Sequence, residues 1–206
     1  VTAKLNTLSG RDVTVTITKT GTATATTDYT LGSTITIPTG SLSALITLTA
    51  VDDSRDEASE TIIIDITNVV DGTVFGDQQK VINIIDDELP PNVILSVGAV
   101  IIREKTGTTS TVVTAAIDAA SERDVTVTLS KGGTATETAD YTLSGTLTIL
   151  AGNLSTSTAL SAKNDTPLDE EDETVEIAIS GVVNGTDAST PQTVTIMDDY
   201  NLTTVT

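Results

Sequence analysis

Carboxylate side chains are concentrated in one short segment, 51–61, with the sequence VDDSRDEASET. Apolar residues alternate with polar ones on both sides, so we expect a loop between two strands, at 44–51 and 61–67. Carboxylates this close repel one another, and calcium relieves such repulsion because it takes six to eight oxygen ligands. The segment therefore indicates either a calcium-binding loop or a solvated acidic loop. Its carboxylates belong to Asp52, Asp53, Asp56, Glu57 and Glu60.

The composition limits the other chemistry that is open to the chain. It has 206 residues, a formal net charge of -19, a pI near 4.1, and neither cysteine nor histidine. Thiol catalysis, disulfides and the commonest general base are therefore excluded. The charge favours cations over nucleic acid or anionic membranes as partners. There is no apolar run of about 18 residues to insert into a membrane. Because aromatic residues are only 2% of the chain, a sugar-binding cleft is not expected, and we predict that the protein is not an enzyme.

The chain contains two copies of one sequence pattern. RDVTVT, GTAT and DYTL each occur twice, and the second occurrence lies 112 positions after the first, as for Asp140 and Asp28. Two prolines in ELPPN break the strand pattern between the copies. We therefore expect two tandem domains, at 1–89 and 90–199. Residues 200–206 are expected to be the start of a next strand or a tail.

Both copies show the alternation that is typical of β-strands. Val13, Val15 and Ile17 alternate with threonines, and Val125 and Val127 repeat this pattern. Period-2 alternation gives each strand one buried face. Short strands separated by turn residues, with no helical period, predict an all-β fold of two antiparallel immunoglobulin-like sandwiches. In the second copy the strands are expected at 93–103, 110–118, 124–131, 145–150, 156–163, 173–180 and 191–197.

The first copy lacks a counterpart of the N-terminal strand of the second copy. Val1 corresponds to Val113, so nothing in the first copy corresponds to 93–110, whereas NLTTVT at 201–206 resembles the beginning of that stretch. One interpretation is a fragment of a longer array, or a disordered start. The other is that a strand from a neighbouring chain completes the sandwich by β-augmentation and covers the open edge.

Three acidic segments recur in both copies: the loop before each DYT tyrosine, the long acidic loop, and the end of the last strand. If they lie at the same pole of each sandwich, their carboxylates converge. Tyr29 and Tyr141 are expected to pack beneath these loops. In the first copy the carboxylates are Asp28, Asp52, Asp53, Glu57, Glu60, Asp86 and Asp87. In the second copy they are Asp140, Asp165, Glu170, Glu173, Asp198 and Asp199, with Glu104 near the end of the first strand.

The motifs GTAT…DYT, DDSRDEASET and the closing DD resemble those of the Calx-beta domain, and the resemblance covers nearly the whole chain. This family occurs in sodium–calcium exchangers, an integrin subunit and large bacterial surface proteins. The resemblance implies immunoglobulin-like sandwiches that bind Ca²⁺ through acidic loops at one tip. It also implies, by position, that the carboxylates named above, Glu104 included, are the calcium ligands of the two copies.

Together these features predict a calcium-binding structural or adhesive module of an extracellular, secreted or cell-surface repeat protein. Asp86 and Asp87 lead directly into the second copy, so bound calcium is expected to rigidify the junction between the domains. The expected partners are calcium, neighbouring repeats of the same protein and, by strand exchange, other copies. Two alternatives remain open. One is a module that assembles head to tail into a filament by strand complementation, with calcium incidental, and the other is a cytosolic pair of calcium sensors.

Overall fold

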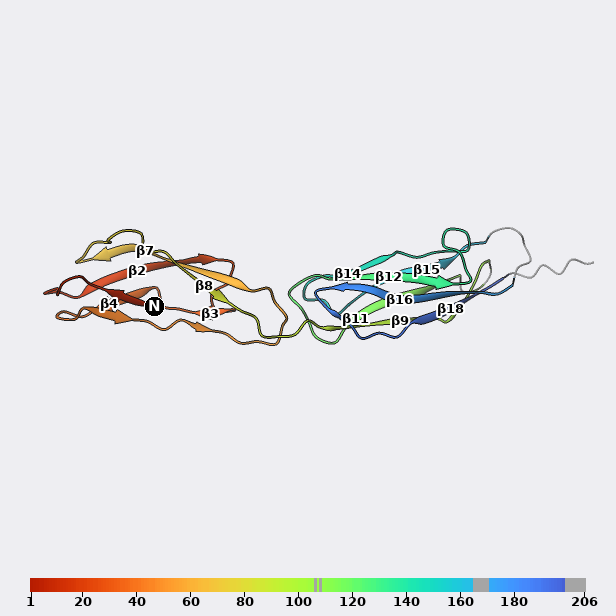
Figure 1. Ribbon diagram of the computed structural model, residues 1–206, viewed down its shortest axis with the longest axis horizontal. Helices are drawn as coiled ribbons and strands as arrows, with labels where there is room; N and C mark the ends of the chain where they lie inside the picture. The colour runs from red at the N-terminus through yellow and green to blue at the C-terminus, as the bar shows by residue number, and fades with distance from the viewer. Residues whose placement is uncertain (106, 108, 165–170, 199–206) are drawn as a thin grey trace, which may run out of the picture. The chain divides into compact units, whose positions relative to one another are not determined.

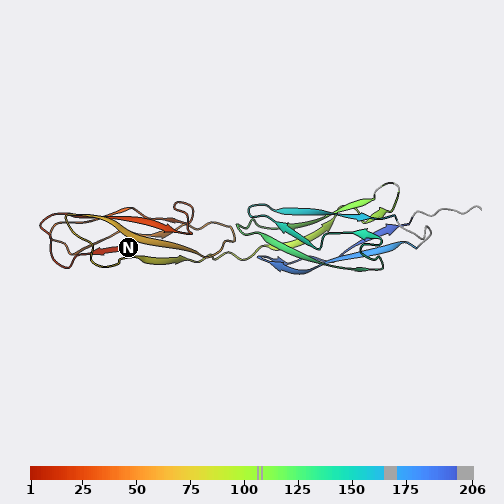
Figure 2. The ribbon, with the colours of Figure 1, turned by 90° about the horizontal axis from the view of Figure 1, so that it is seen from above.

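The structure is a computed structural model in which every described element is a β-strand (Figure 1; Figure 2), and this confirms the all-β expectation. The described residues are 1–105, 107, 109–164 and 171–198. The chain divides into two units, which are Val1–Ser54 with Ala58–Asp87, and Arg55–Glu57 with Glu88–Thr206. Within the described ranges there is no helix with the length and apolar character needed to cross a membrane.

The second unit is built from two five-stranded sheets, with the strand orders β10-β18-β16-β12-β14 and β13-β15-β11-β9-β17. The strands are β9 (Asn92–Val97), β10 (Ile101–Arg103), β11 (Ser110–Ile117), β12 (Val125–Gly133), β13 (Tyr141–Thr142), β14 (Thr146–Ile149), β15 (Ser155–Ala162), β16 (Glu173–Val183), β17 (Thr186–Asp187) and β18 (Gln192–Met197). The prediction of a single strand at 93–103 is therefore wrong. Its two halves join different sheets: β9 pairs antiparallel with β11, and β10 pairs parallel with β18.

The first unit repeats this plan with fewer strands. Its sheets have the orders β4-β2-β7-β8, β1-β5 and β3-β6. The strands are β1 (Thr2–Lys4), β2 (Val13–Gly21), β3 (Tyr29–Thr30), β4 (Thr34–Ile37), β5 (Ser43–Leu45), β6 (Thr49–Ala50), β7 (Glu60–Val70) and β8 (Lys80–Ile84). The strand expected at 44–51 is divided into β5 and β6, because β5 pairs with β1 whereas β6 pairs with β3. No described residue supplies a counterpart of β9 or β10, which confirms the predicted lack of an N-terminal strand.

The core of each unit lies where the alternation predicts it. Val13, Val15 and Ile17 on β2 are buried, and the corresponding positions on β12 are buried as well. Tyr29 and Tyr141 are each 2% exposed. Both tyrosines belong to the cores, so the prediction that they are packing residues is confirmed. The threonines between them on β2 and β12 are half-buried or exposed, so each of these strands has one apolar face turned to the core.

Asn92 and Asp118 join the start of β9 to the end of β11. One Asp118 carboxylate oxygen accepts from the Asn92 backbone N–H and the other from the Asn92 side-chain amide, both at 2.8 Å. The side-chain bond is the main cause that lowers the pKa of Asp118 below its ordinary value of 3.8.

Replacing Asn92 with Ala should raise the pKa of Asp118, although the remaining backbone bond keeps part of the depression. A carboxyl whose pKa is lower in the folded chain stabilises the fold above its unfolded pKa, and this contribution is lost as the pH falls through the folded pKa. The variant should therefore lose stability above about pH 4, and the difference from the parent should disappear in stronger acid. A carbon-detected NMR titration of the Asp118 carboxyl measures the shift. An unchanged midpoint would contradict the role given to the side-chain bond.

Candidate metal centre

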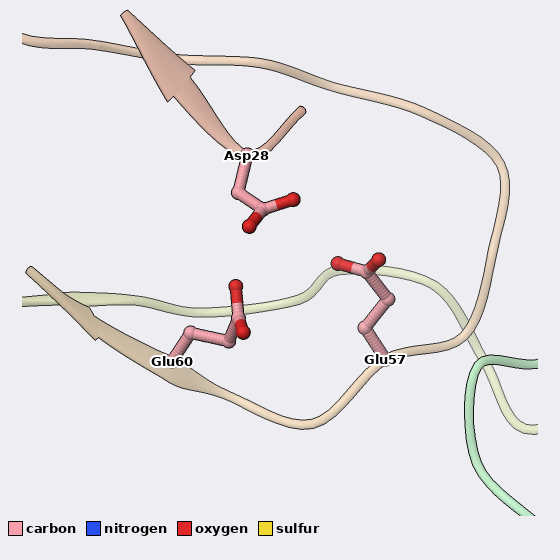
Figure 3. A group of neighbouring side chains, drawn as sticks. All are labelled: Asp28, Glu57 and Glu60. Carbon is pink, nitrogen blue, oxygen red and sulfur yellow. The ribbon is translucent and has the colours of Figure 1, made fainter. Parts of the chain in front are cut away.

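Three carboxylates of the acidic segments converge in the structure (Figure 3). Asp28 lies directly before β3, Glu57 lies in the loop between β6 and β7, and Glu60 is the first residue of β7. Their ligand oxygens lie within 4.8 Å of one another, and all three side chains are half-buried. Calcium lies at 2.3–2.6 Å from its oxygen ligands, so oxygens up to about 5 Å apart fit one coordination shell. These three positions were predicted from the sequence, and they form one cluster.

A tight turn fixes the position of Asp28. Its backbone N–H donates to the carbonyl of Thr24 at 3.0 Å, and its carboxylate accepts from the N–H of the same threonine. Asp140 makes the same two bonds with Thr136, at 3.0 and 2.6 Å. Because the tyrosine that follows points into the core, alternation along the chain turns the aspartate away from it. The DYT motif therefore presents a carboxylate at the same place in both units.

A close backbone contact fixes the position of Glu60. Gly21 pairs with Ile62, and its φ of 117° lies in the region that favours glycine. The next two residues continue the contact, because Thr61 N–H donates to the Thr22 hydroxyl at 2.9 Å and Ala23 N–H donates to the Thr61 carbonyl at 3.1 Å. The GTAT motif is thus the support for the strand end that carries Glu60.

A second acidic group consists of Asp52, Asp87 and Glu88, whose ligand oxygens also lie within 4.8 Å of one another. Asp52 and Asp87 are exposed, and Glu88 is half-buried. The sequence analysis did not select Glu88 as a ligand, although it extends the DD motif to a run of three acids. Two other predicted ligands, Asp53 and Asp86, are described but belong to neither group.

The predicted ligands of the second unit are only partly described. Glu104, Asp140 and Asp198 are buried, with 9%, 7% and 7% of their surface exposed, and Glu173 is half-buried at the start of β16. The other predicted ligands, Asp165, Glu170 and Asp199, lie outside the described residues. Among the described carboxylates of this unit, no three have ligand oxygens within 4.8 Å of one another, unlike the two groups that contain Asp28 and Asp52. Burial, followed by the charges of Glu137 and Asp140, raises the pKa of Tyr141, which is consistent with its packing beneath an acidic loop.

Asp56, the remaining acid of the opening loop, has a different role. It is 3% exposed and groups with the second unit, where its carboxylate accepts from the Ser121 hydroxyl at 2.7 Å and from Arg123 Nε at 3.2 Å. The Arg123 Nη2 donates to its other oxygen. A guanidinium thus compensates this negative charge, so Asp56 is a structural ion-pair partner and not part of either acidic group.

No family model matches this chain, and no curated protein matches it. Several solved structures do. The crystal structure of CBD12 from CALX1.2 is 16% identical over 95% of this chain and 91% of its own, with a TM-score of 0.40. The crystal structure of calcium binding domain CBD12 of CALX1.1 is 15% identical over 96% of this chain and 91% of its own, with a TM-score of 0.41. The crystal structure of the apo-form Calx CBD1 domain is 21% identical over 52% of this chain and 98% of its own, with a TM-score of 0.43. These three structures are of Calx CBD domains, either CBD1 alone or the CBD12 region.

Proposed function

We propose that this protein is a calcium-binding structural or adhesive module of an extracellular repeat protein. The observation that carries the proposal is the convergence of Asp28, Glu57 and Glu60 from separate segments of the chain. Three half-buried carboxylates offer hard oxygen ligands and a negative charge that a divalent cation neutralises. Calcium suits them better than magnesium, because magnesium requires near-octahedral geometry and keeps several of its waters.

The group formed by Asp52, Asp87 and Glu88 supports a role for calcium at the junction. Asp87 is the last residue of the first unit and Glu88 begins the main segment of the second. An ion bound by both residues and by Asp52 would restrict the chain where it passes from one unit to the next. Extracellular modules bind calcium with dissociation constants of about 10⁻⁴–10⁻³ M, which suits the millimolar calcium outside cells.

We extend the proposal to the second unit. Its carboxylates Glu104, Asp140, Glu173 and Asp198 are buried or half-buried although acidic side chains are ordinarily exposed. Bound calcium would compensate such charges. The resemblance of the sequence motifs implies that Asp165, Glu170 and Asp199 complete this second site.

Calorimetric titration of the chelator-treated chain with CaCl₂ tests the proposal. We expect saturable binding with a dissociation constant near 10⁻⁴–10⁻³ M, and much weaker heats with MgCl₂. Heats that are absent, or equal for the two cations, would mean that the carboxylates form a solvated acidic surface, and the proposal would be wrong.

Small-angle scattering with and without calcium tests the junction. Calcium should narrow the distribution of interatomic distances in the parent chain, because the bound ion restricts the connecting segment. Asp52→Ala should weaken this response, whereas Glu176→Ala should keep it, because Glu176 is an exposed acid on β16 outside every acidic group. Identical scattering profiles of the parent with calcium and with chelator would argue against calcium-dependent rigidity.

A further inference from the structure

A pocket of about 320 Å³ lies beside Lys19 in the first unit. It is lined by Lys19 near the end of β2, by 25–26, by 29–32 around β3 and by Thr47. Its volume falls within the range of about 300–1,000 Å³ that is usual for small-molecule sites. Every lining residue has a counterpart 112 positions later in the second unit, within 131–159. The two units can therefore be compared here residue by residue.

A lysine ammonium is held at the same place in both units. Lys19 Nζ donates to the Leu31 carbonyl at 2.8 Å. The corresponding Lys131 Nζ donates to the Leu143 carbonyl at 2.7 Å. Both lysines are half-buried. Each positive charge is thus partly withdrawn from water, and an anion beside it would compensate for the lost hydration.

The partner of the ammonium differs between the units. Lys131 forms an ion pair with the carboxylate of Glu137. The residue that corresponds to Glu137 in the first unit is Ala25. Lys19 donates instead to the neutral Ser33 hydroxyl at 3.0 Å, and within the described residues it forms no ion pair. Because an ammonium has three N–H donors, Lys19 retains one donor and an uncompensated charge.

The turn that carries Ala25 has the same backbone geometry as the turn that carries Glu137. Thr26 and Thr138, the next residues, both have a φ of 77°, which is rare for a residue with a branched side chain. Each donates its backbone N–H to the carbonyl three residues later, at 2.8 and 2.9 Å. Ala25 therefore lies where Glu137 lies in the second unit, and it leaves open the space beside Lys19 that a glutamate would fill.

We propose that the pocket beside Lys19 binds the carboxylate of a small organic acid, in the place that the Glu137 carboxylate has in the second unit. Alanine together with an acetate ion has the non-hydrogen atoms of a glutamate side chain, so a short aliphatic acid is the smallest ligand that fits. The charge-assisted hydrogen bond from Lys19 Nζ supplies the main part of the affinity. Tyr29 and Leu31 line the pocket beside the apolar part of the acid.

The residue at position 25 determines whether the site is open. A glutamate at this place closes the site with its own side chain, as Glu137 does, whereas alanine leaves it open. The second unit is therefore an internal control for the first. Neither Lys19 nor Ala25 belongs to an acidic group, so the proposal is independent of the calcium sites.

Titration of the complete, ¹⁵N-labelled and calcium-free chain with sodium propionate tests the proposal by NMR. The chain is dialysed free of chelator, because common chelators are carboxylates, and the ionic strength is kept constant with NaCl. We expect saturable shifts of the amide signals of 25–26 and 30–32, and none at 137–138 or 142–144. Propionamide, the uncharged analogue, should bind at least about tenfold more weakly, because it cannot form a charge-assisted bond with Lys19.

Two reciprocal variants identify the site. Ala25→Glu should abolish propionate binding, because the new carboxylate pairs with Lys19 as Glu137 pairs with Lys131. Glu137→Ala should create a second site, with saturable shifts at 138 and 142–144, and should leave binding to the first unit unchanged.

Four results would overturn the proposal. They are no saturable shifts in the parent, equal binding of propionamide and propionate, undiminished binding by Ala25→Glu, and no new site in Glu137→Ala. The last two variants change opposite units, so a folding defect in one of them does not affect the result from the other. Because calcium is absent throughout, failure here would leave the proposed calcium sites untouched.

Discussion

Calcium at a hundredfold excess over its dissociation constant is expected to raise the melting temperature of the first unit by about 10–20 °C. A ligand that binds only the folded state at this excess stabilises it by about 2.7 kcal/mol. For a domain of this size, 1 kcal/mol corresponds to about 4–8 °C. Magnesium at the same concentration should give a small fraction of this shift. Scanning calorimetry is the suitable measurement, because two units unfold and a single-transition analysis would not apply.

The Glu60→Gln variant should change this result in a way that identifies the site. In chelator its melting temperature should equal or slightly exceed that of the parent, because one of three mutually repelling charges is removed from the Asp28–Glu57–Glu60 group. In calcium it should melt well below the parent, because an amide oxygen is a poorer calcium ligand than a carboxylate. A variant that is only destabilised would melt below the parent both in chelator and in calcium. A melting temperature that is lower than the parent's in calcium alone therefore identifies the loss of a calcium ligand.

Glu176→Gln is the matched control for this variant. It makes the same chemical change at an exposed position of β16 that belongs to neither acidic group. It should retain the full response to calcium. If Glu60→Gln and Glu176→Gln responded alike, bound calcium would not be held by Glu60, and the ion would have to be sought at Asp52, Asp87 and Glu88.

The internal repeat made much of the fold predictable. The correspondence of Val1 with Val113 was enough to predict that the first unit lacks an N-terminal strand, because the missing segment is present once in the same sequence. Alternation placed Val13 and Val125 in the cores correctly. Alternation could not show that 93–103 is two strands, because both halves have apolar residues and only the pairing partners distinguish them.

The acidic loop shows the limit of prediction from the sequence for the site. Asp56 and Glu57 are adjacent, yet one pairs with Arg123 and the other joins the Asp28 group. A loop has no period from which the direction of a side chain follows, so only the folded chain separates these roles. Asp28 and Glu60 were easier to place, because each lies at the beginning of a strand. The residue after Asp28 is buried in the core, and the strand that begins with Glu60 is held by its pairing with neighbouring strands.

Replacing Gly21 with Ala is expected to destabilise the first unit by about 2–6 kcal/mol. An added Cβ would lie 2.2 Å from the carbonyl oxygen of Thr61 and 2.9 Å from its carbonyl carbon. These are backbone atoms, so the strand that begins with Glu60 would have to move. Displacing packed atoms costs about 1–3 kcal/mol, and the φ of 117° at Gly21 adds about 1–3 kcal/mol for a residue with a side chain. Because Glu60 moves with the strand, calcium binding to the first unit should weaken as well.

Alanine substitutions at two other glycines of the same unit separate the cost of the close contact from the cost of the positive φ. Gly40 has a φ of 75° but no atom within 4 Å of an added Cβ, so Gly40→Ala should cost only the conformational part, about 1–2 kcal/mol. Gly10 has neither feature, so Gly10→Ala should be neutral or stabilise by up to about 1 kcal/mol through the unfolded chain. Urea unfolding followed by the amide signals of each unit gives the three free energies. If Gly21→Ala cost no more than Gly40→Ala, the contact with Thr61 would not position Glu60. A larger loss of stability in Gly21→Ala than in the other two variants would show that Gly21 of the GTAT motif supports the calcium site, although it offers no ligand.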